Sequence, residues 1–465
     1  MNPLLNKLFL YYPATAFTGE FHFLYQGLYR SQQYQSTDSL FRYQLRQFTA
    51  LLGHAVHHKP YYRRILPADA HLDCRQIHAP EDFQRFYNAL PVLTKQDLIG
   101  HHQELSGKVH LSSRIKTTGG STGEPVKLYK NASALARERV ATALSYEWAG
   151  IQVGAKQARF WGIPHSNRAK FIARITDLVA NRYRLSAFDM TDADMAGYYR
   201  HLLVVKPAYL YGYVSAIRLF ANYIKHTNLA PLPSLKAVIT TSEVLSELDR
   251  HDIEQGFAVK VFNEYGCGEV GSIAHECEQG SLHVMASNLL VQVERDGITY
   301  NHGTGEIVLT DLHNYATPLI RYKLGDYATL APGGCSCGRG LPVLSRVHGR
   351  AYDIIHTPEG RSIHPEAIIY IFEKMQEQRA VFKQFQVLQD RLDHLTIRII
   401  PTANFNNTIG RDIQVAVRTK ISAAMQISLE LVNTIEREKS GKLRVVKSQL
   451  TADDNRLPMA NTRRS

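Results

Sequence analysis

The pattern of apolar and polar positions divides the chain into four stretches. Residues 1–110 carry aromatic and aliphatic side chains on one side of predicted helices, so this lead-in is mainly helical. Residues 111–260 alternate helical segments with short apolar runs, which is typical of a layered α/β body. Residues 284–330 alternate apolar and polar positions around turns, which predicts β-hairpins. From residue 349 onward the pattern mixes helix and strand and has the size of a small domain.

Individual elements follow from the same periodicities. We predict helices at residues 132–148, 365–378 and 413–421. We predict strands at residues 113–116, 235–240, 289–293, 306–310, 385–389, 395–400 and 429–435. The Asp296-Gly297 pair predicts a hairpin turn after the strand at 289–293.

These elements predict the domain organisation. A chain of 465 residues buries a large core and splits into two or more domains. We expect an α/β fold with a large, multi-layered N-terminal domain over residues 1–348 that includes a β-rich subdomain. A small α+β domain over residues 349–465 follows it.

The lead-in is rich in tyrosine, and its apolar side has two interpretations. The tyrosines are Tyr11, Tyr12, Tyr25, Tyr29 and Tyr34. The apolar side could pack on the main body or lie on a membrane surface. We favour packing on the body, because that is the usual fate of an amphipathic helix in a globular protein.

Composition narrows the class of protein. The chain is 44% hydrophobic and 21% charged, as in globular proteins that stay in solution. It lacks the run of roughly 20 apolar residues that a membrane span needs. It also lacks a secretory signal, so we expect a cytoplasmic protein.

The formal net charge of +12 raises the question of nucleic-acid binding. Lysine and arginine are scattered, and no basic, aromatic-interleaved module is visible, so we expect no nucleic-acid partner. A basic surface that attracts small anionic substrates explains the charge equally well.

The most informative segment is Thr117-Thr118-Gly119-Gly120-Ser121-Thr122-Gly123-Glu124-Pro125. Small residues let backbone N–H groups and hydroxyls approach a polyphosphate closely. The segment is not a Walker loop, because no Gly-Lys-Ser/Thr follows the glycines. Alone, it could equally be a surface turn.

Four further motifs follow in order, and each taken alone fits an ordinary turn. Residues 263–269 combine an aromatic, glycines and a glutamate that could hold a divalent metal. Residues 321–326 end in an aspartate that could accept two hydrogen bonds from ribose hydroxyls. Residues 349–353 lie where the β-rich stretch gives way to the last domain. Residues 440–442 place a lysine on a polar loop.

Together and in this order, these five segments resemble the adenylate-forming superfamily of acyl-CoA synthetases and adenylation domains. The resemblance covers residues from about 40 to 450. Within the superfamily the chain is most similar to the phenylacetate-CoA ligase branch and its capsule-biosynthesis, CapK-like members. Residues 60–62, 211–215 and 280–283 support that branch.

The resemblance implies a two-step reaction and a role for each matched residue. ATP and Mg²⁺ bind, a carboxylate attacks the α-phosphate, and an acceptor, usually coenzyme A, then displaces AMP. The β- and γ-phosphates would be held by Thr118, Gly119, Gly120, Ser121, Thr122 and Gly123. The nucleotide would also contact Ser242, Glu243, Asn263, Glu264, Tyr265, Gly266, Asp326 and Arg350.

Two residues would take part in the chemistry. Glu269 would hold Mg²⁺, and Lys442 would stabilise the charge that develops near the α-phosphate. The small C-terminal domain would be a mobile lid that moves Lys442 away between the steps. The chain departs from the family pattern where Gly268 replaces a hydroxyl residue and where Tyr352 stands at the hinge.

The five cysteines suggest a second site. Cys277 and His283 stand near each other, and Cys335 and Cys337 form a second pair, so four ligands could hold tetrahedral Zn²⁺. Some relatives in this branch are similar in carrying a structural metal there. Free thiols near a turn are the alternative. Cys267 or His275 could replace one ligand.

The acid-binding pocket is less well defined. Trp161, Tyr211 and Tyr213 fall where relatives line it, and they fit a planar acid or a plain core. His165 lies in the same region, and we assign it no catalytic role.

Three functions remain open. The acceptor could be the thiol of coenzyme A or of a carrier protein, or an amine, as in polysaccharide or natural-product biosynthesis. A non-catalytic binding protein could also keep this fold, but it would have no need for Lys442 and Glu269. The expected partners are therefore a small carboxylic acid, ATP and an acceptor, and the chain could form a homodimer.

Overall fold

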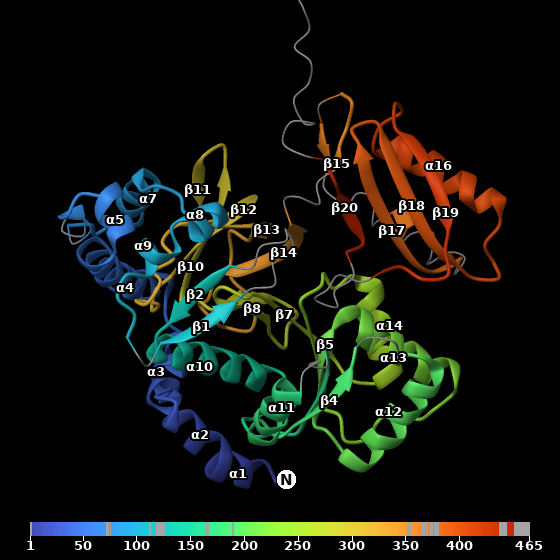
Figure 1. Cartoon of the computed structure of the whole chain (residues 1–465), viewed down its shortest axis with the longest axis horizontal. Coiled ribbons are helices and arrows are strands. Elements are labelled where there is room, and N and C mark those ends of the chain that lie inside the picture. The colour runs from blue at the N-terminus through green and yellow to red at the C-terminus, as the bar shows by residue number, and fades with distance from the viewer. Residues whose placement is uncertain are drawn as a thin grey trace, which may run out of the picture. The chain divides into compact units, whose positions relative to one another are not determined.

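The structure is a computed structural model with two separate compact units. The units are residues 1–347 and residues 348–465, and each is described by itself (Figure 1). The residues that the structure describes are 2–70, 74, 76–110, 113–117, 126–162, 167–187, 190–350, 355–359, 361–363, 368, 371–372, 375, 381–436 and 444–450.

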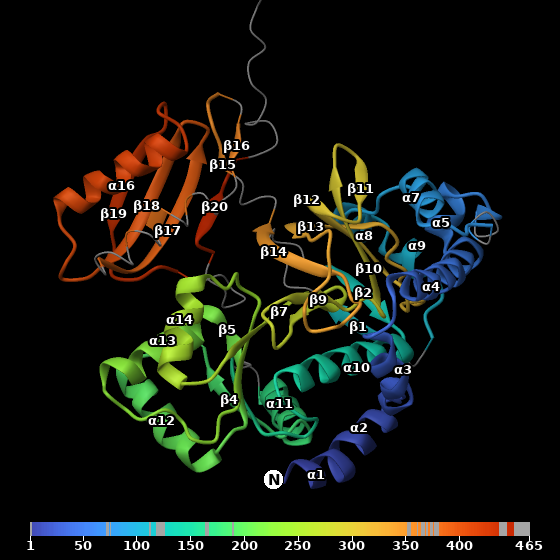
Figure 2. The same cartoon turned by 180° about the vertical axis from the view of Figure 1, so that it is seen from behind.

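A twelve-stranded sheet runs through the first unit (Figures 1 and 2). Its strand order is β11-β10-β12-β13-β14-β9-β8-β7-β6-β5-β3-β4. The strands are β3 (Gln157–Trp161), β4 (Arg182–Ser186), β5 (Tyr209–Tyr213), β6 (Ala237–Thr241), β7 (Val261–Cys267), β8 (Gly271–Glu276), β9 (Leu282–Val284), β10 (Leu289–Arg295), β11 (Ile298–Tyr300), β12 (Gly303–Asp311), β13 (Tyr322–Leu330) and β14 (Val343–Arg350). A separate hairpin pairs β1 (Arg114–Thr117) with β2 (Lys127–Lys130).

The sheet changes character at β7. This strand runs parallel to β6 and antiparallel to β8. β4, β3, β5, β6 and β7 form a parallel half, and β7, β8 and β9 continue with antiparallel pairing. Parallel strands need crossover connections, and helices supply them here.

Helices cover both faces of the parallel half. The helices that follow the hairpin are α10 (Ala132–Trp148), α11 (Asn167–Val179), α12 (Asp192–Val205), α13 (Val214–His226) and α14 (Glu247–Phe257). In β5 and β6, Leu210 and Val238 join the core under α13 and α14, whereas Tyr209, Tyr211 and Ile239 join the core on the opposite face. Continuous burial on two faces explains why these strands are apolar throughout.

Several sequence predictions coincide with these elements. The helix predicted at 132–148 is α10, and the strands at 289–293 and 306–310 lie within β10 and β12. The strand predicted at 235–240 begins two residues late, as β6. The Asp296-Gly297 turn joins β10 to β11, a three-residue strand that the sequence analysis missed because it is so short.

The lead-in is helical, as predicted. It contains α1 (Pro3–Asn6), α2 (Tyr12–Phe17), α3 (Gln26–Gln32), α4 (Thr37–His58), α5 (Pro60–Ile65), α7 (Pro80–Ala89), α8 (Lys95–Gly100) and α9 (His102–Ser106), with a π-helical turn η1 (Lys7–Tyr11) and a 3₁₀ turn η2 (His22–Tyr25). α4 buries Phe48, Leu51 and Leu52 against the antiparallel half of the sheet, so its apolar side packs on the body.

The first 28 residues depart from the favoured interpretation. Phe9 is 70% exposed and Phe17 is 94% exposed, so much of this segment's apolar side does not pack on the body. Among the described residues, no helix combines the length and apolar character needed to cross a membrane.

The second unit contains a four-stranded sheet in the order β19-β18-β17-β20. Its elements are β15 (Ile355–His356), β16 (Ser362–Ile363), β17 (Phe382–Arg391), β18 (His394–Pro401), α16 (Asn407–Lys420), β19 (Gln426–Leu431) and β20 (Val446–Ser448). α16 buries Ile409, Ile413 and Val417 against the sheet.

Two predictions in this unit need comment. The strand expected at 429–435 is β19, which begins and ends earlier because it pairs with His394 to Ile399 of β18. The helix expected at 365–378 lies mostly outside the described residues.

One glycine tests the contact between β3 and β5. A Cβ on Gly212 would lie 2.5 Å from the carbonyl oxygen of Phe160, so backbone would have to move. We expect Gly212→Ala to lower the free energy of unfolding by about 1–3 kcal/mol. Gly197 of α12 is the matched control: nothing lies within 4 Å of its added Cβ. Gly197→Ala should stabilise the helix by about 0.5–1 kcal/mol.

Urea unfolding of the two variants measures both effects. Equal stability of Gly212→Ala and the unmodified chain would contradict the close approach of β3 and β5.

Candidate active site

The residues singled out by sequence gather where the parallel strands end. Register pairs Phe160 with Gly212, Gly212 with Thr240, and Thr240 with Asn263, so β3, β5, β6 and β7 end at one edge. Trp161, Tyr213 and the Ser242-Glu243 turn therefore share this edge with the end of β7. The carboxyl edge of parallel strands is the usual ligand site of α/β proteins.

The turn after β6 is held by a helix terminus. The Glu243 carboxylate accepts hydrogen bonds from the Ser215 backbone N–H at 2.7 Å and from the Ser215 hydroxyl at 3.0 Å. Ser215 lies in the first turn of α13, where a carboxylate stabilises the unpaired N–H groups. Ser242 adopts a φ of +70°, an unusual conformation for a residue with a side chain. The turn holds the Ser242 backbone in this conformation.

β7 presents different side chains to its two faces. The Tyr265 hydroxyl donates to the Asp326 carboxylate at 2.7 Å. The Glu264 carboxylate, on the other face, accepts from the hydroxyls of Tyr146 at 2.8 Å and Tyr211 at 3.3 Å. Burial, with the Glu264 charge next in effect, raises the pKa of Tyr211, so this tyrosine stays a neutral donor.

The Tyr265–Asp326 bond requires a strongly curled sheet. β8, β9 and β14 lie between β7 and β13 in the strand order. Across a flat sheet, four strand spacings separate the two backbones by about 19 Å, too far for these side chains to bridge. The antiparallel half therefore curls until β13 faces β7.

Glu269 lies in the turn between β7 and β8, beside the same strand. Its side chain is buried, and it accepts a hydrogen bond from the Tyr322 hydroxyl at 3.3 Å. Burial raises the pKa of the neighbouring Cys267 thiol, and the charges of Glu269 and Asp326 raise it further. The structure thus brings Tyr265, Glu269 and Asp326 around one part of β7.

The aromatic residues predicted for the acid pocket are in contact. The rings of Trp161 and Tyr213 stack with centroids 4.4 Å apart and an interplanar angle of 20°. The Arg159 guanidinium lies 4.2 Å from the Trp161 ring and 4.8 Å from the Tyr211 ring. The buried Nε atom of Arg159 has no hydrogen-bond partner among the described residues.

Sequence reasoning missed Arg159. Its position two residues before Trp161 in β3 was the only available signal, because alternate residues of a strand share one face.

The hairpin that flanks the predicted phosphate loop is anchored by buried charges. Lys130 contacts the carboxylates of Glu138 at 3.0 Å and Asp311 at 3.1 Å, and Lys116 contacts Glu138 at 2.6 Å. Burial alone would lower the pKa of Lys130, but the two carboxylates outweigh it and raise the pKa. Thr117 pairs with Lys127 at the end of the hairpin, where the loop begins and ends.

Some predicted residues lie outside the described part of the chain. These are Thr118, Gly119, Gly120, Ser121, Thr122, Gly123, His165, Tyr352 and Lys442. The backbone of Arg350 ends β14, and its side chain is not among those described.

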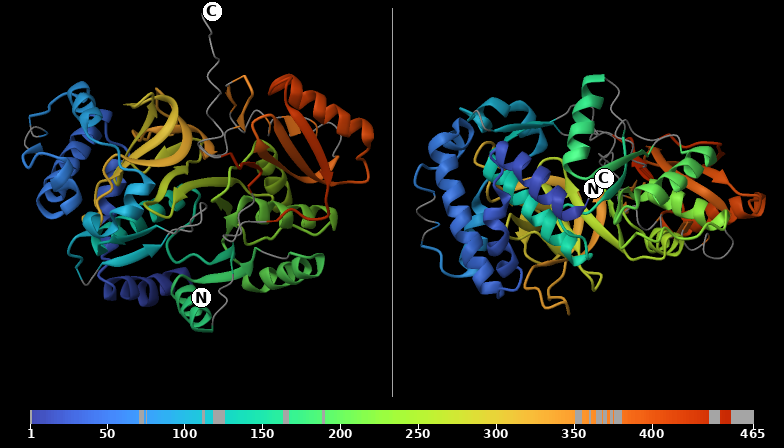
Figure 3. Two further views of the ribbon diagram at one scale, coloured as in Figure 1. Left: turned by 45° about the horizontal axis from the view of Figure 1, so that its top comes forward. Right: turned by 90° about the horizontal axis from the view of Figure 1, so that it is seen from below.

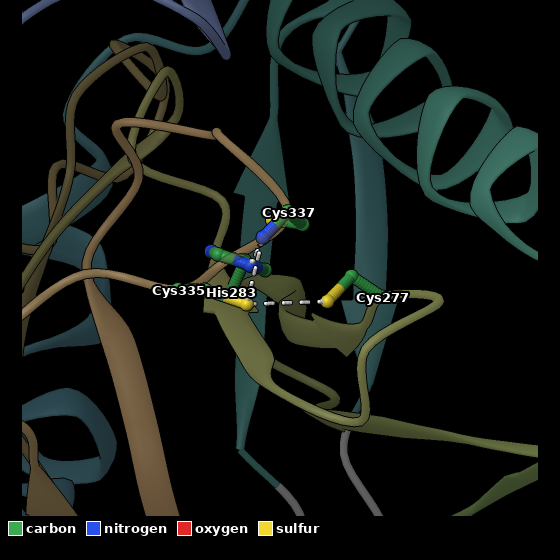
Figure 4. A group of neighbouring side chains, drawn as sticks. All are labelled: Cys277, His283, Cys335 and Cys337. Atoms are coloured by element: carbon green, nitrogen blue, oxygen red, sulfur yellow. Dashed lines mark hydrogen bonds between the residues drawn. The ribbon is translucent and has the colours of Figure 1, made fainter.

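The four predicted metal ligands form one cluster (Figure 4). The ligand atoms of Cys277, His283, Cys335 and Cys337 all lie within 4.8 Å of one another. The Sγ atoms of Cys277 and Cys335 are 3.8 Å apart, and the Cys337 Sγ lies 3.2 Å from the His283 Nε2. Cys267 and His275, the suggested substitutes, are not in this group.

The cluster has the geometry of a tetrahedral site. With Zn–S bonds of about 2.3 Å, two thiolates on a tetrahedron lie about 3.8 Å apart. The His283 Nδ1 lies 3.3 Å from the Leu341 carbonyl oxygen, and a bond there leaves Nε2 facing the thiols. Burial raises the pKa of Cys277 to about 11, so a bound cation would have to displace that proton.

Comparison with known proteins finds a matching family model and similar sequences. The family model described as the CapK C-terminal domain matches residues 355–449. Protein CapK of Staphylococcus aureus is 25% identical over 370 residues, 77% of this chain and 79% of that protein. Phenylacetate-coenzyme A ligase of Thermus thermophilus is 25% identical over 390 residues, 78% of this chain and 82% of that protein.

A solved structure shares the fold. The crystal structure of 2-hydroxyisobutyryl-CoA ligase, in the postadenylation state in complex with R3-HIB-AMP, superposes with a TM-score of 0.71. It is 19% identical, and the match covers 90% of this chain and 91% of that chain. The predicted α/β fold class and the resemblance seen in the motifs are therefore confirmed: the chain is a homologue of CapK and of phenylacetate-coenzyme A ligases, with the fold of the adenylate-forming acyl-CoA ligases.

Proposed function

We propose that this protein is an ATP-dependent carboxylate ligase. In the first step the carboxylate of the substrate attacks the α-phosphate of ATP, which forms an acyl-adenylate and releases pyrophosphate. In the second step the thiol of coenzyme A attacks the acyl carbon, AMP leaves, and an acyl thioester forms. Homology to phenylacetate-coenzyme A ligases supports both steps.

One observation carries the proposal. The curled sheet joins Tyr265 to Asp326 by a 2.7 Å hydrogen bond and places Glu269 in contact with Tyr322 on the same strand as Asp326. An aromatic face, a carboxylate suited to ribose hydroxyls and a carboxylate suited to a cation are thereby assembled at the edge of the parallel strands. A mononucleotide with Mg²⁺ would use each of these groups.

The nucleotide would contact this edge from base to phosphate. Tyr265, with the Ser242-Glu243 turn, would line the adenine pocket, and Asp326 would bind the ribose. The phosphates would reach the loop between β1 and β2, whose backbone N–H groups and hydroxyls suit an anion. The buried Lys130–Asp311 pair would hold that hairpin in place.

Asn263, Glu264 and Gly266 would support the nucleotide site from β7. Glu264 acts through the tyrosines that it orders, because its carboxylate is taken up by Tyr146 and Tyr211. A Cβ on Gly266 would lie 2.4 Å from the Gly271 carbonyl oxygen, so only glycine allows the tight turn that carries Glu269.

Two residues from the C-terminal part complete the proposal. Arg350 would grip the nucleotide, and Lys442 would place a positive charge beside the α-phosphate and the carboxylate in the first step. A compact ammonium on a flexible stem suits that task. The unit that carries it would act as a mobile lid and withdraw Lys442 before thiol attack.

The aromatic cluster beside this site would favour a planar acid. The stacked Trp161 and Tyr213 rings, with Tyr211 beside them, offer flat apolar surfaces. Arg159 lies over two of these rings, and its buried Nε donor would bind a polar group on the acid. An aryl acid with a hydroxyl or carbonyl substituent fits this combination.

An amine acceptor is the second candidate. This candidate rests on the similarity to CapK and on the CapK C-terminal domain match at residues 355–449. The same acyl-adenylate would then form an amide bond, with AMP as the leaving group. AMP release measured with acid and ATP, plus either coenzyme A or an amine panel, separates the two acceptors.

The first step is tested by pyrophosphate exchange into ATP across aromatic, fatty, hydroxy and amino acids. Lys442→Ala should slow exchange with the best acid by about 10²- to 10³-fold, because the preorganised charge at the transition state is lost. ATP binding, measured by calorimetry, should change little.

Lys447→Ala is the matched control, because Lys447 lies in β20 of the same unit. It should exchange pyrophosphate at the unmodified rate. Asp326→Ala should instead weaken ATP binding. Full exchange by Lys442→Ala contradicts the role of that lysine, and absence of exchange with every acid contradicts carboxylate activation.

We further propose that the cysteine cluster holds a structural Zn²⁺. Cys277, Cys335 and Cys337 would bind as thiolates and His283 through Nε2, a closed set without a free position for a reacting group. The cation would join the turn after β8 to the loop before β14.

Metal analysis of the purified protein tests the cluster, with one Zn²⁺ per chain expected. Cys335→Ser should remove the metal and lower the melting temperature. A site filled at one hundred times its Kd adds about 2.7 kcal/mol to the free energy of unfolding. Cys74→Ser is the control, since Cys74 lies outside the cluster. Equal zinc content in both variants would show that the cluster is not the site.

A further inference from the structure

Large apolar side chains are exposed along the first 28 residues. The nine exposed positions are Leu4, Leu5, Leu8, Phe9, Phe17, Phe21, Phe23, Leu24 and Leu28. Exposed apolar patches of this extent on a folded chain mark a surface that another phase or partner covers. Ring contacts between Tyr12 and Phe23 and between Phe21 and Phe23 hold part of the segment in this arrangement.

α11 has the opposite orientation to an ordinary surface helix. Its carboxylate, Asp177, faces the protein and pairs with Arg182 at 3.5 Å and Arg184 at 3.0 Å. Its large apolar side chains face outward, and they are Phe171, Ile172, Ile175 and Leu178. A helix normally turns its apolar stripe toward the core. This stripe is therefore directed at something outside the described protein.

The two exposed segments meet at α1. The Asn6 side-chain amide donates to the carbonyl oxygens of Leu178 at 3.4 Å and Val179 at 3.1 Å, so α1 lies against the end of α11. Figure 3 shows the N-terminal helices and α11 next to each other in both views. We call this combined surface, formed by residues 2–28 and α11, the apolar face.

The charges around the apolar face are positive. Arg168, Lys170 and Arg174 are exposed on α11, and none of them pairs with a carboxylate among the described residues. Residues 1–35 contain one acidic residue, Glu20, which is buried and pairs with Arg139. Glu20 and Asp177, the two acidic residues of the apolar face, therefore point inward, and the exposed charges on α11 are basic.

We propose that the apolar face docks in the plane of an anionic lipid bilayer. Amphipathic segments with a basic polar face and Phe or Leu on the other side bind at the headgroup boundary without crossing it. Each exposed lysine or arginine is attracted to acidic headgroups, and the aromatic residues suit the interfacial region.

A second copy of the chain fits this surface less well. A two-fold interface would place the apolar face against itself and bring the same arginines and lysine into opposition. Lipid headgroups of opposite charge remove that repulsion. The proposal does not depend on the ligase activity.

Co-sedimentation with lipid vesicles tests the proposal on the full chain. We expect binding to vesicles of equal parts phosphatidylcholine and phosphatidylglycerol, at least about tenfold weaker binding to phosphatidylcholine alone, and weakening by salt. The variant Phe171→Ser/Ile175→Ser should lose at least about tenfold in partitioning, because two inserted side chains become polar.

Two further variants complete the design. Val415→Ser/Leu431→Ser changes exposed apolar residues of the second unit and should bind vesicles as the unmodified chain does. Lys170→Glu/Arg174→Glu leaves every apolar residue in place and should lose binding to the anionic vesicles selectively. It also gives an answer if the serine variant fails to fold.

Three results would overturn the proposal. The first is sedimentation that the apolar and charge variants leave unchanged, and the second is no sedimentation at all. The third is a dimer in analytical ultracentrifugation that Phe171→Ser/Ile175→Ser converts to a monomer without vesicle binding by either form. That result would assign the apolar face to a second copy.

Discussion

The pairing of β7 is the constraint on which the rest of the first unit depends. One edge of β7 bonds to a parallel neighbour, and the other bonds to an antiparallel neighbour that follows it directly in the chain. Because β7 is parallel to β6, it ends at the same edge of the sheet as the other parallel strands. Because β7 is antiparallel to β8, the chain reverses at once, within residues 268–270. A turn carrying Glu269 is therefore fixed at the edge where the crossover helices begin.

Curling of the antiparallel half joins residues that lie far apart in the strand order. It brings β13 over β7, so that Asp326 meets Tyr265 although three strands intervene. The cysteine cluster needs only neighbouring strands: β9 pairs directly with β14, which brings His283 and the turn after β8 close to the loop before β14. The right-handed twist of adjacent strands accumulates across a sheet and permits such closure. The proposed cation at the cysteine cluster would stabilise the pairing of β9 with β14, which is one step in the strand order from β7 to β13.

The aromatic cluster of Trp161, Tyr211 and Tyr213 and the apolar face are linked by the course of the chain. β3 ends in Trp161, which stacks on Tyr213, and α11 begins at Asn167, only six residues later. The strand is fixed by the sheet on both sides, and α11 is fixed by the ion pairs of Asp177 with β4. The polar inner side of α11 thus leaves its apolar side facing outward.

The sequence by itself determined what depends on local order. Helical spacing gave α10, alternation gave β10 and β12, and the order of five short motifs indicated the fold and the residues that we propose for a nucleotide site. The tertiary structure decided which distant residues touch: the curvature that joins Tyr265 to Asp326 is a property of many strands and is encoded in no single segment. It also placed Arg159 over the aromatic rings and turned the apolar side of α11 outward. Periodicity shows that a helix has two sides, but the neighbours that pack against it decide which side faces the protein.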